Sequence, residues 1–430
     1  MTRLAGAVWT MLFMTLAWGQ AADAGGTFKD DLALLKKHTD VIVLSDAVRR
    51  AQVAVVPQYQ GRVMTSTASG PGGTSFGWIN AKQVASGVRQ PHINVFGGED
   101  RFWLGPEGGQ FAIFFPQGTK FDLEHWQTPA PIDWGGWKVV AKSSNHALFR
   151  KEMTLTNYSG FRFNVLAQRE VRLLNSRQIA AAFGTKLSPR VRSVAYESVN
   201  RITNQGQQPW TKKTGLLSVW ILSMFNPSPA TTIVVPFKPG PVARLGRIVN
   251  DAYFGKVPPD RLVVKANQGV LFFKGDGKYR SKIGIGPQRA KPILGSYDAS
   301  RQLLTLVQYT LPAGATSYVN SMWEMQKNPY GGDVVNSYND GPLSNGQQLG
   351  PFYELESSSP AAALRPGASL RHVHRTLHLQ GPTAELDRIA RRTLGVGLAE
   401  ITGAFRTYPN RQIEPREHRT MELWSAGFQP

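Results

Sequence analysis

Short apolar runs with an alternating character recur along most of this chain. Examples are "QFAIFFPQG", "FRFNVLAQREVRLL", "TTIVVPFKPG" and "LLTLVQYTLPAG", and residues of the types Gly, Pro, Asn and Asp separate them. Alternation between turn residues is what a half-buried antiparallel strand requires. The pattern therefore predicts a mostly β protein.

Helical periodicity is confined to the two ends of this β region, in "TFKDDLALLKK" near the start and "TAELDRIARRTLGVGLAEI" near the end. No repeat of fixed period occurs, which disfavours a propeller or a solenoid. We expect one large sandwich of antiparallel strands over residues 40–382, with a few peripheral helices. A helical lead-in over 25–39 and a C-terminal helix with an extension over 383–430 flank it.

The N-terminus has the layout of a secretory signal. A basic tip at Arg3 precedes the apolar run "LAGAVWTMLFMTLAWG", and "QAADA" ends in a small-residue pattern. We expect residues 1–24 to be a signal peptide, so that the mature protein is exported to the periplasm or the extracellular space without an integral membrane span. An uncleaved anchor is the alternative, although the run is shorter than the ~20 residues that a spanning helix needs.

Charge and cysteine content narrow the classes of partner. The net charge is +20, and residues 171–301 hold 21 Lys or Arg against 5 Asp or Glu, while cysteine is absent. Disulfides and thiol chemistry are therefore excluded. The positive field would attract anionic partners, and an anionic polysaccharide or envelope surface fits an exported protein better than nucleic acid, which we do not expect as a partner. Basic side chains scattered over solvated faces are the alternative.

The segment "NVFGGEDRFWLGPEGGQ" gathers candidate sugar-binding groups. It combines several glycines with Arg101, Trp103 and Glu107. An indole face can cover the C–H face of a pyranose, and carboxylates and guanidinium groups can bond its hydroxyls. A strand–turn–strand corner held by an Arg–Glu pair is the structural alternative.

Two further segments add aromatic and acidic side chains. "FDLEHWQTPAPIDWGGW" contains His125, a candidate for acid–base work, beside Trp126. "NSMWEMQKNPYGGDVVNSYNDGPL" contains Trp323, Tyr330 and Asp333 and is interpreted as a strand edge and a long loop. Large aromatics are also ordinary core residues and Asp an ordinary turn residue, so both segments keep a structural interpretation.

The segment "FYELESSSP" places Glu354 and Glu356 two residues apart in a β-like context. In a strand both side chains project to one face. Two carboxylates in contact repel, which raises one apparent pKa and suits that group to acid–base catalysis. On an exposed strand the pair would simply be hydrated.

The nearby "RHVHRTLHL" could offer histidines to a metal, but the pattern lacks a clear third ligand, so we expect neither a metal nor a cofactor.

The order of motifs is similar to that of known proteins. "YQGRVMTSTASG", "ITNQGQQPW" and "YELESSSPAAALRPGAS" resemble the galactose mutarotase-like, or aldose epimerase, superfamily, and "FGGEDRFWLGPEGGQ", "MFNPSPATTIVVPFK" and "YGGDVVNSYNDGP" resemble an uncharacterised family of secreted bacterial proteins within it. The resemblance implies a large antiparallel β-supersandwich with a sugar site on its concave face. It also implies that Glu356 is the general base, with Glu354 as its same-face neighbour.

The sequence departs from the superfamily pattern at the general acid. The catalytic histidine would follow the Thr-Asn-x-Gly element, where this chain reads "TKKTGLLSVWILSMFNP". We expect Glu354, Glu107 or His125 to supply the proton instead. Three hypotheses remain. The first is an exported epimerase, hydrolase or lyase that acts on carbohydrate, and the second is a noncatalytic glycan-binding protein on the same scaffold. The third is an envelope-associated structural protein, which an apolar and closed concave face would favour. The oligomeric state stays open.

Overall fold

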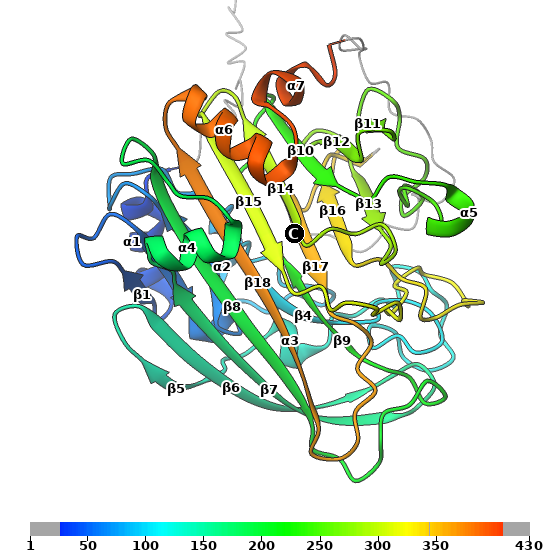
Figure 1. Cartoon of the computed structure of the whole chain (residues 1–430). Helices are drawn as coiled ribbons and strands as arrows, with labels where there is room; N and C mark the ends of the chain where they lie inside the picture. The colour runs from blue at the N-terminus through cyan, green and yellow to red at the C-terminus, as the bar shows by residue number, and fades with distance from the viewer. Residues whose placement is uncertain (1–25, 344, 407–430) are drawn as a thin grey trace, which may run out of the picture.

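The computed structural model describes residues 26–343 and 345–406. Most of the described chain forms antiparallel strands in three sheets of ten, five and three strands, with helices at the periphery (Figure 1). The predicted fold class, a mostly β protein with large antiparallel sheets and few helices, is confirmed. The predicted signal peptide and most of the predicted C-terminal extension lie outside the described residues.

The ten-stranded sheet forms one layer of the molecule. In spatial order its strands are β11 (Leu262–Lys265), β12 (Val270–Lys274), β10 (Thr231–Pro236), β14 (Ile293–Asp298), β15 (Leu303–Tyr309), β18 (Ser369–Gln380), β8 (Arg192–Asn204), β7 (Arg162–Leu173), β6 (His146–Thr156) and β5 (Lys138–Lys142).

The two smaller sheets form the second layer. The five-stranded sheet has the spatial order β13 (Ser281–Ile285), β16 (Val335–Asn339), β17 (Tyr353–Ser358), β9 (Ser218–Leu222) and β4 (Arg101–Gly105). The three-stranded sheet contains β1 (Ile42–Ser45), β2 (Gln52–Val56) and β3 (Arg62–Thr67). A single β-bridge between Val63 and Asp100 connects these two sheets.

The helices are short and peripheral. They are α1 (Phe28–His38), α2 (Ala81–Ser86), α3 (Ala130–Asp133), α4 (Ser176–Phe183), α5 (Val242–Leu245), α6 (Thr383–Leu394) and α7 (Leu398–Gly403), with one 3₁₀ turn at Pro57–Tyr59. The capping box between Thr27 and Asp30 starts α1. The left-handed Gly395 ends α6. None of the helices in the described ranges is long and apolar enough to cross a membrane.

The main core fills the space between the layers. Along β7 buried and more exposed residues alternate, so one face of the strand enters the core and the other faces outward. Leu294 and Val307 of the ten-stranded sheet share one cluster with Ile283 and Leu355 of the five-stranded sheet. On the opposite face of the ten-stranded sheet, α6 and α7 cover β10 and β14 (Figure 1) and bury their own apolar residues there. Each large apolar side chain buried in this way contributes ~1.5–3 kcal/mol.

Charged groups between the layers are paired. Arg169 and Asp100 have fully buried side chains and form an ion pair of 2.6 Å. The same guanidinium donates to the carbonyl of Gly61 and to Oδ1 of Asn200.

The three histidines of β18 also point into the space between the layers. His372 and His374 each lie 2.9 Å from the Ser357 hydroxyl, and His378 pairs with Glu99. No group of side chains in the described ranges could hold a metal ion.

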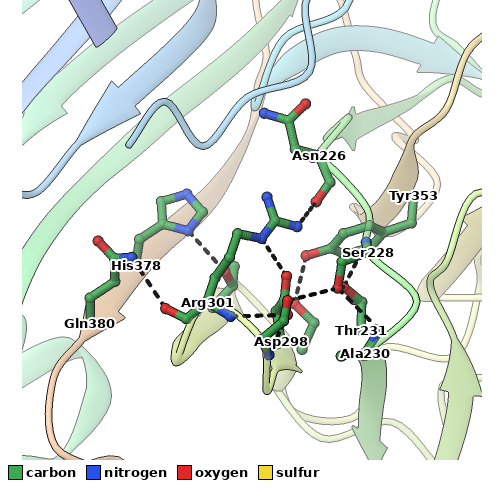
Figure 2. Close-up of polar contacts among 12 residues, drawn as sticks. Asn226, Ser228, Ala230, Thr231, Asp298, Arg301, Tyr353, His378 and Gln380 are labelled. Atoms are coloured by element: carbon green, nitrogen blue, oxygen red, sulfur yellow. Dashed lines mark hydrogen bonds and ion pairs between the residues drawn. The ribbon is translucent and has the colours of Figure 1, made fainter. Parts of the chain in front are cut away.

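A second polar cluster anchors the beginning of β17, the strand that carries the two glutamates. Figure 2 shows Arg301 bonded to Asp298 and to the backbone oxygen of Asn226. Two residues before Asp298 on β14, the Ser296 hydroxyl lies 2.8 Å from the Tyr353 hydroxyl. Strand β17 is thus attached to the other layer of the sandwich immediately before Glu354.

The buried ion pair generates a stability prediction. Substitution Arg169→Met should lower the free energy of unfolding by about 3–5 kcal/mol, because it leaves the Asp100 carboxylate buried without a partner. Urea unfolding followed by tryptophan fluorescence would measure the loss. The matched control is Arg162→Met at the exposed start of the same strand, where the change should stay within about 0.5 kcal/mol. Equal losses in the two variants would contradict the assignment.

Candidate functional site

One face of the five-stranded sheet carries nearly all of the candidate chemistry. The strand register places Glu354 opposite Tyr338, which in turn lies opposite Lys282. On the adjoining pair, Trp103 lies opposite Trp220. Directly opposed residues project to the same side of a sheet. The other side, with Leu355, Ile283 and Ile221, enters the core between the layers, and the polar set lies on the opposite side, where Trp103, Trp220 and Tyr338 are also buried.

Glu354 is buried and held by Arg101. The Nη2 atom of Arg101 donates to Oε1 of Glu354 at 2.9 Å, and the guanidinium carbon lies 4.3 Å from the centre of the Trp103 ring. Burial raises the pKa of Glu354 to about 8, against the lowering effect of Arg101, and the negative charge of Glu356 adds to the rise. Glu354 therefore keeps its proton at neutral pH.

Glu356 is fully buried and has different partners. Its Oε2 accepts from Trp220 Nε1 at 2.8 Å and from Lys282 Nζ at 3.2 Å, and Lys282 Nζ also lies 3.2 Å from Oε1. The ammonium lies 4.8 Å from the centre of the Trp220 ring. A cation and an indole donor thus contact this carboxylate directly.

The two carboxyl groups influence each other, because the negative charge of Glu356 adds to the rise in the pKa of Glu354. Two carboxyls in contact cannot both be ionised at low cost. The environment separates their roles, because a protonated carboxyl can act as an acid while an ionised one can act as a base. The spacing E-x-E predicted that both glutamate side chains project to one face of the strand. The structure adds that Glu354 is the carboxyl that holds the proton.

Glu107 joins the site from the loop after β4. Its Oε1 accepts from Trp126 Nε1 at 3.1 Å. Burial raises the pKa of Glu107; Lys282 opposes that rise, and Glu356 adds to it. Trp126 stacks on Trp323 with ring centres 6.0 Å apart. The structure therefore brings together Glu107, Trp126 and Trp323, which are remote from Glu356 in sequence.

Asp333 lies at the opposite end of the set, beyond Lys282. Its Oδ2 accepts from the Tyr253 hydroxyl at 2.6 Å and from Asn250 Nδ2 at 3.0 Å. The Tyr253 ring centre is 5.5 Å from Lys282 Nζ. Burial raises the pKa of Asp333, while the bonds from Tyr253 and Asn250 oppose the rise. Asp333 therefore reaches the two glutamates only indirectly, through Tyr253 and Lys282.

Two predicted site residues lie elsewhere. His125 is partly exposed and pairs with Asp122 at 2.5 Å. Tyr330 stacks on Phe111 and donates to the carbonyl of Lys212. Neither side chain has a described contact with the glutamate pair, although Trp126 and Trp323 from the same two segments reach Glu107.

Three residues of the site were not predicted. Lys282 is a single cation in the strand "SKIGI", Trp220 lies in the apolar run "LLSVWILSM", and Tyr253 lies in a loop. A charged residue within an otherwise apolar strand is the one signal that could have found Lys282. Trp220 and Tyr253 have no such signal, since aromatic residues are common in any core.

The site also contains buried donors that no described residue accepts from. These are Nε and Nη1 of Arg101 and Nε1 of Trp103. Both residues are only 3% exposed. A buried donor without an acceptor is costly, and these three N–H groups lie within the site next to Glu354.

A pocket of about 460 Å³ opens near the five-stranded sheet, and neither glutamate is among its lining residues. It is lined in part by Arg280 and Asp340, which lie at the ends of β13 and β16. Arg280 Nε donates to the Tyr338 hydroxyl at 3.1 Å, and that hydroxyl donates to Asp340 Oδ1 at 2.5 Å. Because Tyr338 lies opposite Glu354, the pocket wall and the glutamates share one sheet face. Its volume is in the range of small-molecule sites.

The raised pKa of Glu354 predicts how stability depends on pH. The folded state keeps this proton up to about pH 8, whereas the ordinary value is 4.5. Between these values the unfolded chain binds fewer protons than the folded one, so the free energy of unfolding falls as pH rises, by up to ~1.4 kcal/mol per unit. Urea unfolding from pH 5 to 8 should show that Glu354→Gln removes this decline. The exposed Glu152→Gln should leave it unchanged, and identical slopes for wild type and Glu354→Gln would contradict the assignment.

Two solved structures have low sequence identity to this chain and cover most of it. The chain is similar to the solved structure of a putative aldose 1-epimerase from Escherichia coli K12, with 13% identity over 80% of this chain and 99% of that one and a TM-score of 0.49. It is also similar to a galactose mutarotase-like protein from Lactobacillus casei ATCC 334, with 10% identity, 79% and 100% coverage and a TM-score of 0.47.

No curated protein sequence matches the chain. The sequence model of a family of unknown function, DUF6786, matches residues 26–405. The matched range covers nearly the whole described part of the molecule, including both sandwich layers and the glutamate pair. The chain belongs to this family of unknown function, DUF6786.

Proposed function

We propose that this protein is a carbohydrate-active enzyme that moves protons on a sugar ring, with Glu356 as the base and Glu354 as the acid. The observation that carries the proposal is the pair of buried glutamates on one face of β17, in which burial and the Glu356 charge raise the pKa of Glu354 to about 8. Acid–base catalysis needs one protonated and one ionised group within reach of the same substrate. The pair supplies both near neutral pH.

The surroundings of the pair suit a hydroxyl-rich ring. Trp103 and Trp220 lie with ring centres 5.5 Å apart beside the carboxyls, and each ring has a cation against it, Arg101 at Trp103 and Lys282 at Trp220. Arg101 and Trp103 carry the unmatched donors, which would bond ring or hydroxyl oxygens of a sugar that reaches them.

The reaction proposed for this pair is an anomer exchange. In an anomer exchange Glu356 takes the proton of the anomeric hydroxyl and Glu354 gives its proton to the ring oxygen. The ring C–O bond breaks and an aldehyde forms. Return of both protons re-forms the ring in either configuration.

The proposal includes export of the protein. The support is the pattern of a basic tip, an apolar run and a small-residue cleavage motif at the N-terminus. An exported enzyme of this kind would meet free sugars or glycans of the cell envelope as substrates.

A noncatalytic glycan-binding protein is the second candidate. It is favoured by the low exposure of the pair, 5% for Glu354 and 0% for Glu356, since both carboxyls already have protein partners. The stretch between His146 and His372 also lacks the histidine that mutarotase-like proteins use as the acid. In this case the glutamates would only support the fold of the site.

Substitution of Glu356 tests the catalytic role. Proton NMR of a panel of neutral and acidic sugars should reveal accelerated anomer exchange with wild type, and Glu356→Gln should lower that rate by a factor of about 10²–10⁴ while binding is retained. The control Glu152→Gln removes an exposed carboxylate from the other layer and should keep full activity. Full activity of Glu356→Gln would remove it as the base. Binding without exchange would favour the second candidate, and absence of sugar binding would refute both.

The pKa of Glu354 predicts how the rate of anomer exchange changes at alkaline pH. Because the acid form is lost as pH rises through about 8, the exchange rate should fall above that pH. Glu354→Gln should abolish this fall together with most of the activity. Rates measured from pH 5 to 10 would test this, and a flat wild-type profile across pH 8 would exclude Glu354 as the acid.

A further inference from the structure

The outer face of the ten-stranded sheet carries a row of cations far from the glutamate pair. In strand register Arg371 of β18 lies opposite Arg201 of β8, which lies opposite Gln168 of β7. Gln168 lies opposite Arg150 of β6, which lies opposite Lys138 of β5. Five neighbouring strands thus present four cations and one amide in a single row. We call these five residues the cationic row.

The cationic row is exposed and poorly neutralised. Arg371, Arg201, Arg150 and Lys138 are all exposed. Within the described ranges Arg371, Arg201 and Lys138 form no ion pair, and only Arg150 pairs, with Glu152. Like charges directly opposite each other destabilise a sheet, and this row contains two such pairs. The sheet therefore tolerates a repulsion that an anionic partner would relieve.

Neighbouring charges on the same face are arranged differently. Four residues further along β18, Arg375 pairs with Glu197, and Glu197 also pairs with Arg172. That row alternates in sign and neutralises itself. The contrast shows that the lack of acidic partners is a property of the cationic row and does not extend over the whole basic face.

A polar groove of about 670 Å³ adjoins the row. Among the residues that line it are Thr203 of β8, Asn164 of β7 and Thr154 of β6, together with Glu152, whose carboxylate pairs with Arg150. The Thr203 hydroxyl lies 2.8 Å from the Ser369 hydroxyl. Hydroxyl and amide groups that donate and accept beside a line of cations match a polymer that carries both hydroxyls and anionic groups.

We propose that the cationic row binds an acidic polysaccharide whose chain runs across the strands. Strands lie ~4.8 Å apart, so four steps give a row of about 19 Å. Adjacent strands rotate by about 20–25°, and the ends of the row therefore cannot all meet a flat lipid surface, whereas a polymer chain can follow the twist. The aromatic platforms on which single-stranded nucleic acids stack are missing from the described residues of the row and its groove.

Removal of two cations tests the row. Wild type should bind polygalacturonate, and binding should weaken as salt is added because the charges are exposed. The double variant Arg201→Gln, Arg371→Gln should bind at least about tenfold more weakly, since two charge-assisted contacts are lost. The control Lys265→Gln, Lys278→Gln removes the same charge at exposed positions around β11 and β12 and should change binding less than about twofold. Glu356→Gln should bind as wild type does, because its carboxylate lies in the other layer.

The other outcomes would overturn the proposal. Equal losses in the two double variants would mean that net charge alone drives binding. Tighter binding to a thymidine 20-mer, or to phosphatidylglycerol vesicles, than to polygalacturonate would assign the row to nucleic acid or membrane. Binding to neutral dextran as strong as to polygalacturonate, or no binding to either, would remove the role of the cations. Circular dichroism of each variant would verify that the fold is retained.

Discussion

The removal of charged groups from water is the constraint on which this structure depends. The polar face of the five-stranded sheet lies beneath loops, and Glu354, Glu356 and Arg101 are at most 5% exposed. Buried charges are tolerated only when they are paired or neutralised. The protein uses both solutions on one strand, with a cation and an indole at Glu356 and a retained proton at Glu354.

The same constraint determines how the two layers are joined. The Arg169–Asp100 pair, the His378–Glu99 pair and the Ser296–Tyr353 contact all connect the ten-stranded sheet to the second layer. Because no disulfide can act in this chain, such contacts must fix the layers relative to each other together with apolar burial. The position of the glutamates thus depends on polar bonds that lie behind them, on the other side of their sheet.

The sequence predicts the strand-rich fold and part of the site, for reasons that are local. Alternation within a strand is sufficient to place Glu354 and Glu356 on one face, and adjacency is sufficient to group Arg101 with Trp103. Lys282 and Trp220 lie 74 and 136 positions from Glu356. Their contact depends on strand order and register, which alternation alone does not determine. The pKa of Glu354 depends in turn on those remote partners and could not be predicted.

The two edge strands of the ten-stranded sheet affect whether the protein aggregates in concentrated solution. An open sheet offers unpaired backbone groups at its two edge strands, and these can recruit strands from other molecules. Here the edges are β11 and β5, of four and five residues. Exposed lysines stand at Lys265 of β11 and at Lys138 and Lys142 of β5, and β5 also contains an irregularity in its register. Short, charged and irregular edges hinder sheet-to-sheet polymerisation, so a sheet of this width can remain unaggregated without closing into a barrel.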